Sequence, residues 1–339
     1  MSTATQQTRI DELKARFPSL NPNKQAAKKT TVSRSLANHI CSEVLKRDPA
    51  AAARWLRRNI LSALPLKSAW HKQIRTLANR LETVADPQNG IASLGKKTAI
   101  FAPGNSKLSF FAFSSLPGHT CPGAGACLAW CYSFRAWRYA GALCRQLLNA
   151  MLLKYRPDIV SEAFRALPHG VIVRLYVDGD FSSVSDVQFW MNELRFRADL
   201  KAYGYSKSWA ELLDYGRDNK YPNNYVLNLS SGSMHNTPAQ REKMAQLLCD
   251  DGNTLVRGGS EKNATFTAVP LSKDAKAVLP KGSKAYSHPA YAPAVRVAAL
   301  RILDQKVFAC PGKCDSCRPD GIHACGDRNF RAPIAIGLH

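Results

Sequence analysis

One short stretch of the chain carries three cysteines, Cys121, Cys127 and Cys131, at C-x5-C-x3-C spacing. Cysteine thiolates are ligands for zinc and for iron–sulfur clusters. Glycines and prolines around the cysteines keep the segment irregular and let its backbone approach a bound group closely. Three thiolates from one loop therefore indicate a metal centre with an open coordination position rather than an isolated structural staple.

A second cysteine group lies near the C-terminus. Its members follow the spacing C-x3-C-x2-C-x7-C and are Cys310, Cys314, Cys317 and Cys325, with His323 two residues before the last. Zinc is commonly held by four cysteines or by three cysteines and a histidine. The C-x3-C-x2-C core is equally compatible with an iron–sulfur cluster. We expect a [4Fe-4S] cluster at the first group and a second metal at the C-terminal group, either another [4Fe-4S] cluster or, as the alternative, zinc.

The remaining cysteines, Cys41, Cys144 and Cys249, stand in helix-like segments, where a small apolar role is expected. No apolar run reaches the ~18 residues that cross a bilayer, and the first residues lack the apolar core of a secretory signal. We therefore expect a cytoplasmic protein without membrane contact. In that reducing compartment, clustered cysteines bind metal more often than they form disulfides.

Patterns of strand and helix alternate from about Lys96 onward, which predicts an α/β fold with a mostly parallel sheet, open or partly closed as a barrel. A helix is expected after the cysteine loop, where Leu143, Leu147 and Met151 recur at helical spacing. The predicted strands are Leu108–Leu116, Gly170–Phe181, Lys201–Trp209, Asn224–Ser233, Asn253–Gly259 and Ala264–Ser272.

Polar residues gather where these predicted strands end, and in parallel α/β folds functional residues lie at the carboxyl ends of strands. The sets are the cysteine loop, Asp178-Gly179-Asp180, Ser206-Lys207-Ser208, Ser230-Ser231-Gly232-Ser233 and Arg257-Gly258-Gly259. Their convergence predicts a ligand pocket. If the protein is an enzyme, Asp180, Ser206 and Ser230 are the expected cofactor or substrate contacts.

The chain is strongly basic, with a net charge of +22, which makes nucleic acid, DNA or RNA, the expected partner. Residues 1–92 hold 16 Lys and Arg against 6 Asp and Glu, a net of +10, and the pattern from Ser33 to Ala85 is helical. The alternative is that these helices only cover the rest of the protein, with their arginines in contact with solvent and not with nucleic acid. The expected basic face includes Arg54, Arg57, Arg58, Lys72 and Arg75.

These patterns divide the chain into four parts. A flexible segment, 1–32, precedes a basic helical region, 33–92. The β/α core with the cysteine loop follows at 93–309, and a cysteine-rich metal-binding segment ends the chain at 310–339.

A three-cysteine loop after the first strand of a β/α core resembles the radical S-adenosylmethionine superfamily. The resemblance implies a [4Fe-4S] cluster on Cys121, Cys127 and Cys131 whose fourth iron binds S-adenosylmethionine. It also implies that Gly179, Asp180 and Ser230 contact this cofactor. The C-x5-C-x3-C spacing departs from the C-x3-C-x2-C of that superfamily.

A second set of residues resembles a phage- and plasmid-borne family of uncharacterised proteins, gene product 88. The resemblance covers about residues 100–339 and implies a mobile-element origin and a metal centre, but no reaction. The residues that carry it are Asn105, Lys107, Cys121-Pro122-Gly123-Ala124, Cys127, Cys131-Tyr132, Asn149, Val173-Arg174, Gly179-Asp180-Phe181, Ala202-Tyr203, Ser206-Lys207-Ser208, Leu229-Ser230, Cys310-Pro311, Cys314 and Cys317.

Two functional hypotheses follow. The first is an iron–sulfur protein of a mobile element, with a core like that of radical S-adenosylmethionine enzymes, that associates with nucleic acid through its N-terminal helices. The second is a nucleic-acid-binding regulator with purely structural metals. It would act in plasmid conjugal transfer or phage gene expression, as a fertility-inhibition-type protein does.

Overall fold

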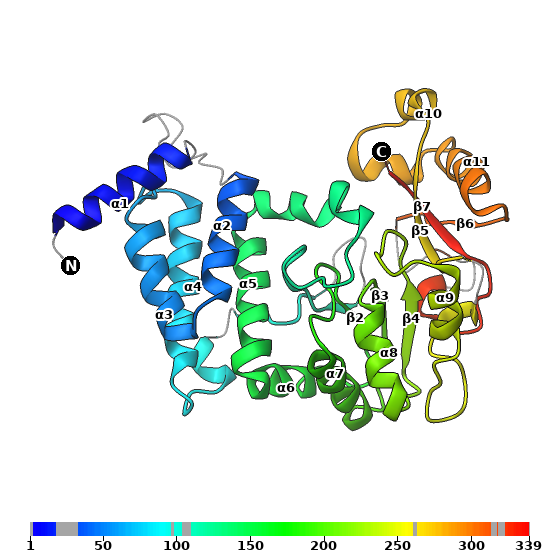
Figure 1. The fold of residues 1–339 in the computed structure, drawn as a ribbon, viewed down its shortest axis with the longest axis horizontal. Helices are drawn as coiled ribbons and strands as arrows, with labels where there is room; N and C mark the ends of the chain where they lie inside the picture. The colour runs from blue at the N-terminus through cyan, green and yellow to red at the C-terminus, as the bar shows by residue number, and fades with distance from the viewer. Residues whose placement is uncertain are drawn as a thin grey trace. The chain divides into compact units, whose positions relative to one another are not determined.

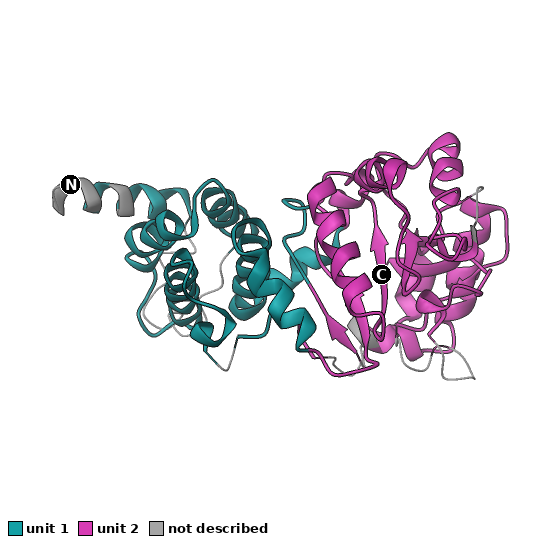
Figure 2. Ribbon diagram, turned by 90° about the horizontal axis from the view of Figure 1, so that it is seen from below, with its two compact units in different colours: residues 1–100, 114–120, 131–166 teal, residues 101–113, 121–130, 167–339 magenta. Residues whose placement is uncertain are grey.

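The computed structural model describes residues 3–17, 33–95, 98–103, 110–259, 263–312, 317 and 323–338. Three residues singled out above, Asn105, Lys107 and Cys314, lie outside these ranges. The chain divides into two compact units (Figure 2). Unit 1 comprises residues 1–100, 114–120 and 131–166, and unit 2 comprises residues 101–113, 121–130 and 167–339.

Unit 1 is helical in the residues that the structure describes. Its helices are α1 (Thr3–Arg16), α2 (Arg34–Leu45), α3 (Pro49–Trp55), the π-helix η3 (Leu56–Leu61), α4 (Ala69–Ala85), the 3₁₀ helices η4 (Ile91–Leu94) and η6 (Tyr132–Arg138), α5 (Ala140–Tyr155) and α6 (Pro157–Arg165).

Local side chains set where these helices begin. The Ser33 hydroxyl accepts a hydrogen bond from the Leu36 N–H at the start of α2, and Asp48 caps α3, where Pro49 occupies the first turn. Ser68 caps α4 in the same way. These caps satisfy N–H groups that lack partners within the helix. The prediction of helices between Ser33 and Ala85 is confirmed.

Unit 2 contains the strands, and all their pairings are parallel. The first sheet has the order β1-β2-β3-β4 and the second the order β5-β7-β6. Figure 1 labels the strands β2 to β7. The strands are β1 (Phe111–Ala112), β2 (Ile172–Leu175), β3 (Lys201–Ser206), β4 (Tyr225–Leu229), β5 (Phe266–Pro270), β6 (Phe308–Ala309) and β7 (Ile334–Leu338). The other elements of unit 2 are η5 (Ala126–Ala129), α7 (Val184–Phe196), α8 (Trp209–Asp218), α9 (Pro238–Ala245), η7 (Arg257–Gly259), α10 (Lys273–Val278), η8 (Gly282–Ser287), α11 (Tyr291–Leu303) and η9 (Ala324–Gly326).

The strand order follows the chain order from β1 to β4, as expected when each strand returns beside its predecessor through a helical crossover. A parallel bridge between Ser230 and Phe266 joins the end of β4 to β5. Mixed α/β structure with parallel sheets is therefore confirmed.

Three predicted strands differ from the structure. Of the strand expected over Leu108–Leu116, only β1 forms, and residues 108–109 lie outside the described ranges. The strand expected over Gly170–Phe181 is only β2, because Tyr176 has φ 56° and turns the chain away from extended geometry. The segment Asn253–Gly259 makes isolated bridges, and it ends in η7, where Gly258 has φ 73°. The prediction of a strand at Asn253–Gly259 was wrong.

The C-terminal strand β7, which the patterns above did not predict, lies between β5 and β6. Helix α11 packs against this sheet through Val295 and Ala299. The Gly337 N–H donates to the Tyr291 hydroxyl at 2.9 Å. Because Pro333 precedes the strand and Gly337 interrupts it, its sequence has weak strand propensity.

Arg257 is fully buried and joins the strands to the C-terminal segment. Its guanidinium donates to the Asn228 side chain at 2.7 Å and to the carbonyls of Thr265, Phe330 and Ala332. Burial lowers the pKa of this arginine, and the four acceptors compensate for its desolvation. None of the helices that the structure describes is both long and apolar enough to cross a membrane.

We expect Arg257→Met to lower the free energy of unfolding by roughly 3 kcal/mol or more, since it leaves buried acceptors without donors. Denaturant unfolding measures this loss. The control is Arg217→Met on α8, where the arginine is exposed and pairs with Asp214. For Arg217→Met, the free energy of unfolding is expected to change by less than about 1 kcal/mol. Equal losses in the two variants would contradict the role assigned to Arg257.

Candidate functional site

The part of the cysteine loop in unit 2 is hydrogen-bonded to the segment that follows β4. The Gly232 carbonyl accepts from the Gly125 N–H at 3.0 Å and from the Cys127 N–H at 3.3 Å. The Met234 N–H donates to the Gly123 carbonyl at 3.0 Å. The loop therefore lies at the carboxyl edge of the sheet, where the sequence placed the candidate pocket.

The loop also packs on the end of β3, and this packing requires glycine. A Cβ at Gly123 would lie 1.7 Å from the Lys207 carbonyl oxygen, and one at Gly125 would lie 2.8 Å from the Met234 nitrogen. Real Cβ atoms essentially never come within 3.0 Å of such atoms. Glycine at both positions thus permits the contact between the loop and the strand ends.

Asp180 is buried at the centre of this edge. One carboxylate oxygen accepts from the Ser206 hydroxyl at 2.8 Å and from the Phe181 N–H at 2.9 Å, and the other accepts from the Lys207 N–H at 2.7 Å. Burial raises the pKa of Asp180, while these donors and the Lys207 charge oppose the rise. Asp180 thus ties the segment after β2 to the end of β3.

The backbone after β2 takes unusual conformations to deliver Asp180. Tyr176 has φ 56°, which is uncommon for a residue with a side chain, and Gly179 has φ 79°. The buried Tyr176 hydroxyl accepts from the Trp190 indole N–H at 3.0 Å, which holds the turn in place. Tyr176 therefore ends the extended structure of β2, and Gly179 turns the chain a second time directly before Asp180.

Lys207 is the residue on which these contacts converge. Its N–H is held by Asp180, and its carbonyl accepts from the Ser233 hydroxyl at 2.9 Å. Its ammonium donates to the Ser230 hydroxyl at 2.8 Å. Among the described residues, no carboxylate forms a salt bridge with this ammonium. A half-buried cation held this way can receive an anionic group of a ligand.

The sequence prediction named Asp180, Ser206 and Ser230 but not Lys207 as a site residue. The structure brings all four together at the carboxyl edge. The sequence feature that could have identified Lys207 as a site residue is its position between Ser206 and Ser208 at the end of a predicted strand. Arg257, also in a predicted strand-end set, does not join this group, because its guanidinium donates to the Asn228 side chain and the Phe330 carbonyl.

The cysteines of the first group are divided between the units. Cys121 and Cys127 belong to unit 2, and Cys131 begins a segment of unit 1. Cys127 is 6% exposed, and Cys121 is half-buried. Within the described residues, no three His, Cys, Asp or Glu side chains form a group that could hold a metal ion.

The second cysteine group surrounds a small cavity. Cys310, Cys317, Cys325 and His323 line it, together with Phe308, Ala324 and Ile334. Its fourth predicted ligand, Cys314, lies outside the described residues. The structure thus brings three of the four predicted cysteines to one place.

The described side chains of this cavity do not form a group that could hold a metal ion as they stand, but two of their features suit metal ligands. The Cys317 sulfur accepts from the Ala324 N–H at 3.2 Å and the Cys310 sulfur from the Gly312 N–H at 3.4 Å, as metal-bound thiolates often do. The Nε2 of His323 is buried and has no hydrogen-bond partner among the residues that the structure describes. Burial lowers the pKa of His323 and favours the neutral imidazole that ligates metals.

Cys41, Cys144 and Cys249 are buried, as expected for small apolar side chains. Burial raises the pKa of the Cys144 thiol to about 12 and raises the pKa values of the other two thiols. Thiols with such pKa values stay protonated at neutral pH and are poor metal ligands.

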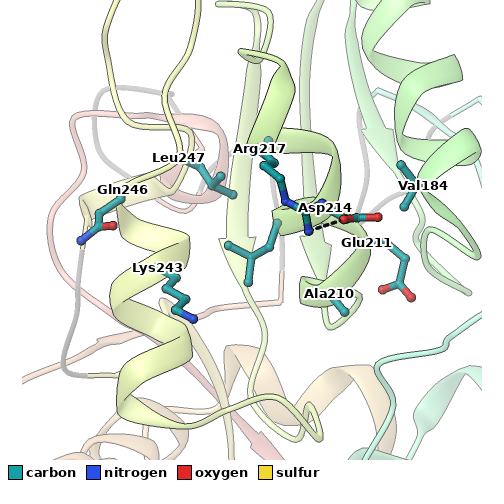
Figure 3. A pocket seen from close by; sticks show the side chains of 10 residues that line it. Val184, Ala210, Glu211, Asp214, Arg217, Lys243, Gln246 and Leu247 are labelled. Carbon is teal, nitrogen blue, oxygen red and sulfur yellow. Dashed lines mark ion pairs between the residues drawn. The ribbon is translucent and has the colours of Figure 1, made fainter.

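A wide groove of about 700 Å³ lies elsewhere on unit 2, along α8 and α9 (Figure 3). The groove is lined by Asp214 and Arg217 of α8, by Lys243 of α9 and by Gln246 directly after it, and Arg217 pairs with Asp214 at 2.6 Å. None of the predicted site residues lines this groove.

The predicted basic residues of unit 1 fall into two groups. Arg54, Arg58, Lys72 and Arg75 are exposed. Arg57 instead pairs with Glu82 and donates to the Asn79 side chain at 3.0 Å. Its charge is therefore largely neutralised within the unit.

The fold and this edge define a class: a parallel α/β protein with a cysteine-rich loop over the carboxyl ends of its strands. The family model of gene product 88 matches residues 76–318, more than half of the chain, and the chain belongs to this family. The predicted resemblance to gene product 88 is thereby confirmed. Neither the curated proteins nor the solved structures yielded a match.

We expect Gly123→Ala to displace the cysteine loop, because the added Cβ meets the backbone of Lys207. Overpacking of this kind costs roughly 1–3 kcal/mol, measured by denaturant unfolding. The control is Gly141→Ala in α5, whose Cβ meets nothing closer than 4.0 Å. That variant should keep or slightly gain stability. A wild-type unfolding midpoint for Gly123→Ala would contradict the packing described.

Proposed function

We propose that this protein is an iron–sulfur protein whose first cluster, [4Fe-4S], is held by Cys121, Cys127 and Cys131. The observation that carries the proposal is the attachment of the cysteine loop to the carboxyl edge of the sheet, beside Lys207. The sequential order β1-β2-β3-β4 supports a barrel-like wall of the kind that radical S-adenosylmethionine enzymes have.

A cluster with an open iron would supply a binding position for S-adenosylmethionine. Lys207 would pair with an anionic group of this ligand, such as its carboxylate, and Ser230 would add a hydroxyl beside it. Asp180 and Ser206 bond to each other and to neighbouring backbone, so their role would be to position Lys207.

The second metal would be bound by Cys310, Cys317 and Cys325, with Cys314 or His323 as the fourth ligand. The buried and unpartnered Nε2 of His323 supports a set of three cysteines and one histidine. Zinc takes this donor set in tetrahedral structural sites. Zinc is therefore our proposal for this cavity, and a second [4Fe-4S] cluster is the alternative.

The helical unit would bring the protein to nucleic acid. Arg54, Arg58, Lys72 and Arg75 are exposed and make no ion pair with another described residue. Such side chains neutralise backbone phosphates and release counterions. The same observation supports the second hypothesis, a nucleic-acid-binding regulator of conjugal transfer or phage gene expression whose metals are structural.

We expect Cys127→Ser to lose the first cluster, because a serine hydroxyl replaces one of three thiolate ligands. Iron, sulfide and zinc are measured after anaerobic purification, and roughly four irons per chain should disappear with the absorbance near 400 nm. Cys41→Ala, which removes a buried thiol from unit 1, should keep its iron. Full iron in Cys127→Ser would refute this site, and a colourless wild-type protein containing only zinc would favour the regulator.

We expect Lys207→Met to weaken binding of S-adenosylmethionine by roughly 10- to 100-fold, the value of a lost charge-assisted hydrogen bond. Calorimetric titration of the anaerobic protein measures this affinity. Lys201→Met, at the exposed start of the same strand β3, should bind as the wild type does. Equal affinity in the wild type and both variants would exclude Lys207 from the site.

A further inference from the structure

The segment that follows the third cysteine of the loop exposes two tyrosines and two arginines. Tyr132 is 55% exposed and Tyr139 is 67% exposed, although large aromatic side chains are usually buried. Arg135 and Arg138 between them are exposed as well. This set of four residues is called the Tyr–Arg row below.

The 3₁₀ geometry of η6 aligns three members of the row. In a 3₁₀ helix residues i and i+3 eclipse, and one turn rises about 6 Å. Tyr132, Arg135 and Arg138 therefore follow one another along one side of η6, and Tyr139 caps the end. Ser133 and Trp137 face the interior of unit 1.

The buried side of η6 holds the row rigidly. The Trp137 indole N–H donates to the buried Gln146 side chain at 2.8 Å, and Phe134 packs edge-on against Trp137. The Arg34 guanidinium lies 3.7 Å from the centre of the Phe134 ring and adds a third arginine beside the row. A ligand would therefore meet side chains on a fixed backbone.

The charge of the row is positive and uncompensated within the described residues. Neither Arg135 nor Arg138 forms an ion pair with a described carboxylate, and Arg138 lies 5.9 Å from the centre of the Tyr139 ring. The start of α5, directly after Tyr139, packs beside Gln73 of α4. Lys72, which precedes Gln73 in α4, is also exposed.

We propose that the Tyr–Arg row binds single-stranded nucleic acid. Unpaired bases stack on Tyr132 and Tyr139, and the arginines between them bind the phosphates. Duplex bases are already stacked on each other and cannot use exposed aromatic rings in this way. This inference rests on the nucleic-acid association proposed above. It specifies that the ligand is a single strand whose bases stack on the two tyrosines.

Fluorescence anisotropy with a labelled oligothymidylate of about 20 nucleotides and with a duplex of equal length tests the inference. Replacing both tyrosines, Tyr132→Ala with Tyr139→Ala, should weaken single-strand binding roughly 30-fold or more, about 5-fold or more for each lost ring, and leave duplex binding nearly unchanged. Tyr139→Phe keeps the ring and should bind normally. Arg135→Gln with Arg138→Gln should lower the salt dependence of single-strand binding by roughly 0.7 for each phosphate that is no longer neutralised.

The controls separate this inference from the broader proposal. Arg54→Glu with Arg58→Glu changes the basic face on α3 and η3 but not the row. If that variant loses single-strand binding and the double tyrosine variant keeps it, the row is not the site, although nucleic-acid association stands. If the wild-type protein binds neither probe near physiological salt, both the association and the row are refuted. Unchanged thermal midpoints show that the surface variants remain folded.

Discussion

The carboxyl edge of the sheet depends on one buried carboxylate. Removing a charged group from water costs several kcal/mol unless donors replace the lost hydration. Asp180 meets this requirement with three donors drawn from two strand ends. Any conformation that separates these strand ends leaves the carboxylate unsatisfied. Its burial therefore fixes the geometry of the edge.

The consequences extend to the cysteine loop. Once Asp180 holds the Lys207 N–H, the Lys207 carbonyl is presented to Gly123 and Ser233, and the loop closes over it. The Lys207 ammonium is left beside Ser230 as the group that a ligand would meet. Asp180, which the sequence offered as a cofactor or substrate contact, thus positions the backbone of Lys207.

The sequence predicted those features that depend on local chemistry. The helices between Ser33 and Ala85 and the alternation of strands and helices after them follow from patterns of neighbouring residues. The insertion of β7 between β5 and β6 depends on pairing between distant segments, which no local pattern records. The ion pair between Arg57 and Glu82 likewise joins two helices, and a count of charges along the sequence does not predict it.

The order of the chain links the two proposed activities. Cys131, the third cysteine of the loop, directly precedes Tyr132, the first residue of the Tyr–Arg row. Ligation of Cys131 would restrict the backbone at the start of η6, since a thiolate bound to a cluster fixes its own main chain. Binding of the cluster at Cys131 would then be coupled to the conformation of the Tyr–Arg row through the peptide bond between Cys131 and Tyr132. In that arrangement metal binding would alter affinity for a single strand, whereas separate structural metals would leave it unchanged.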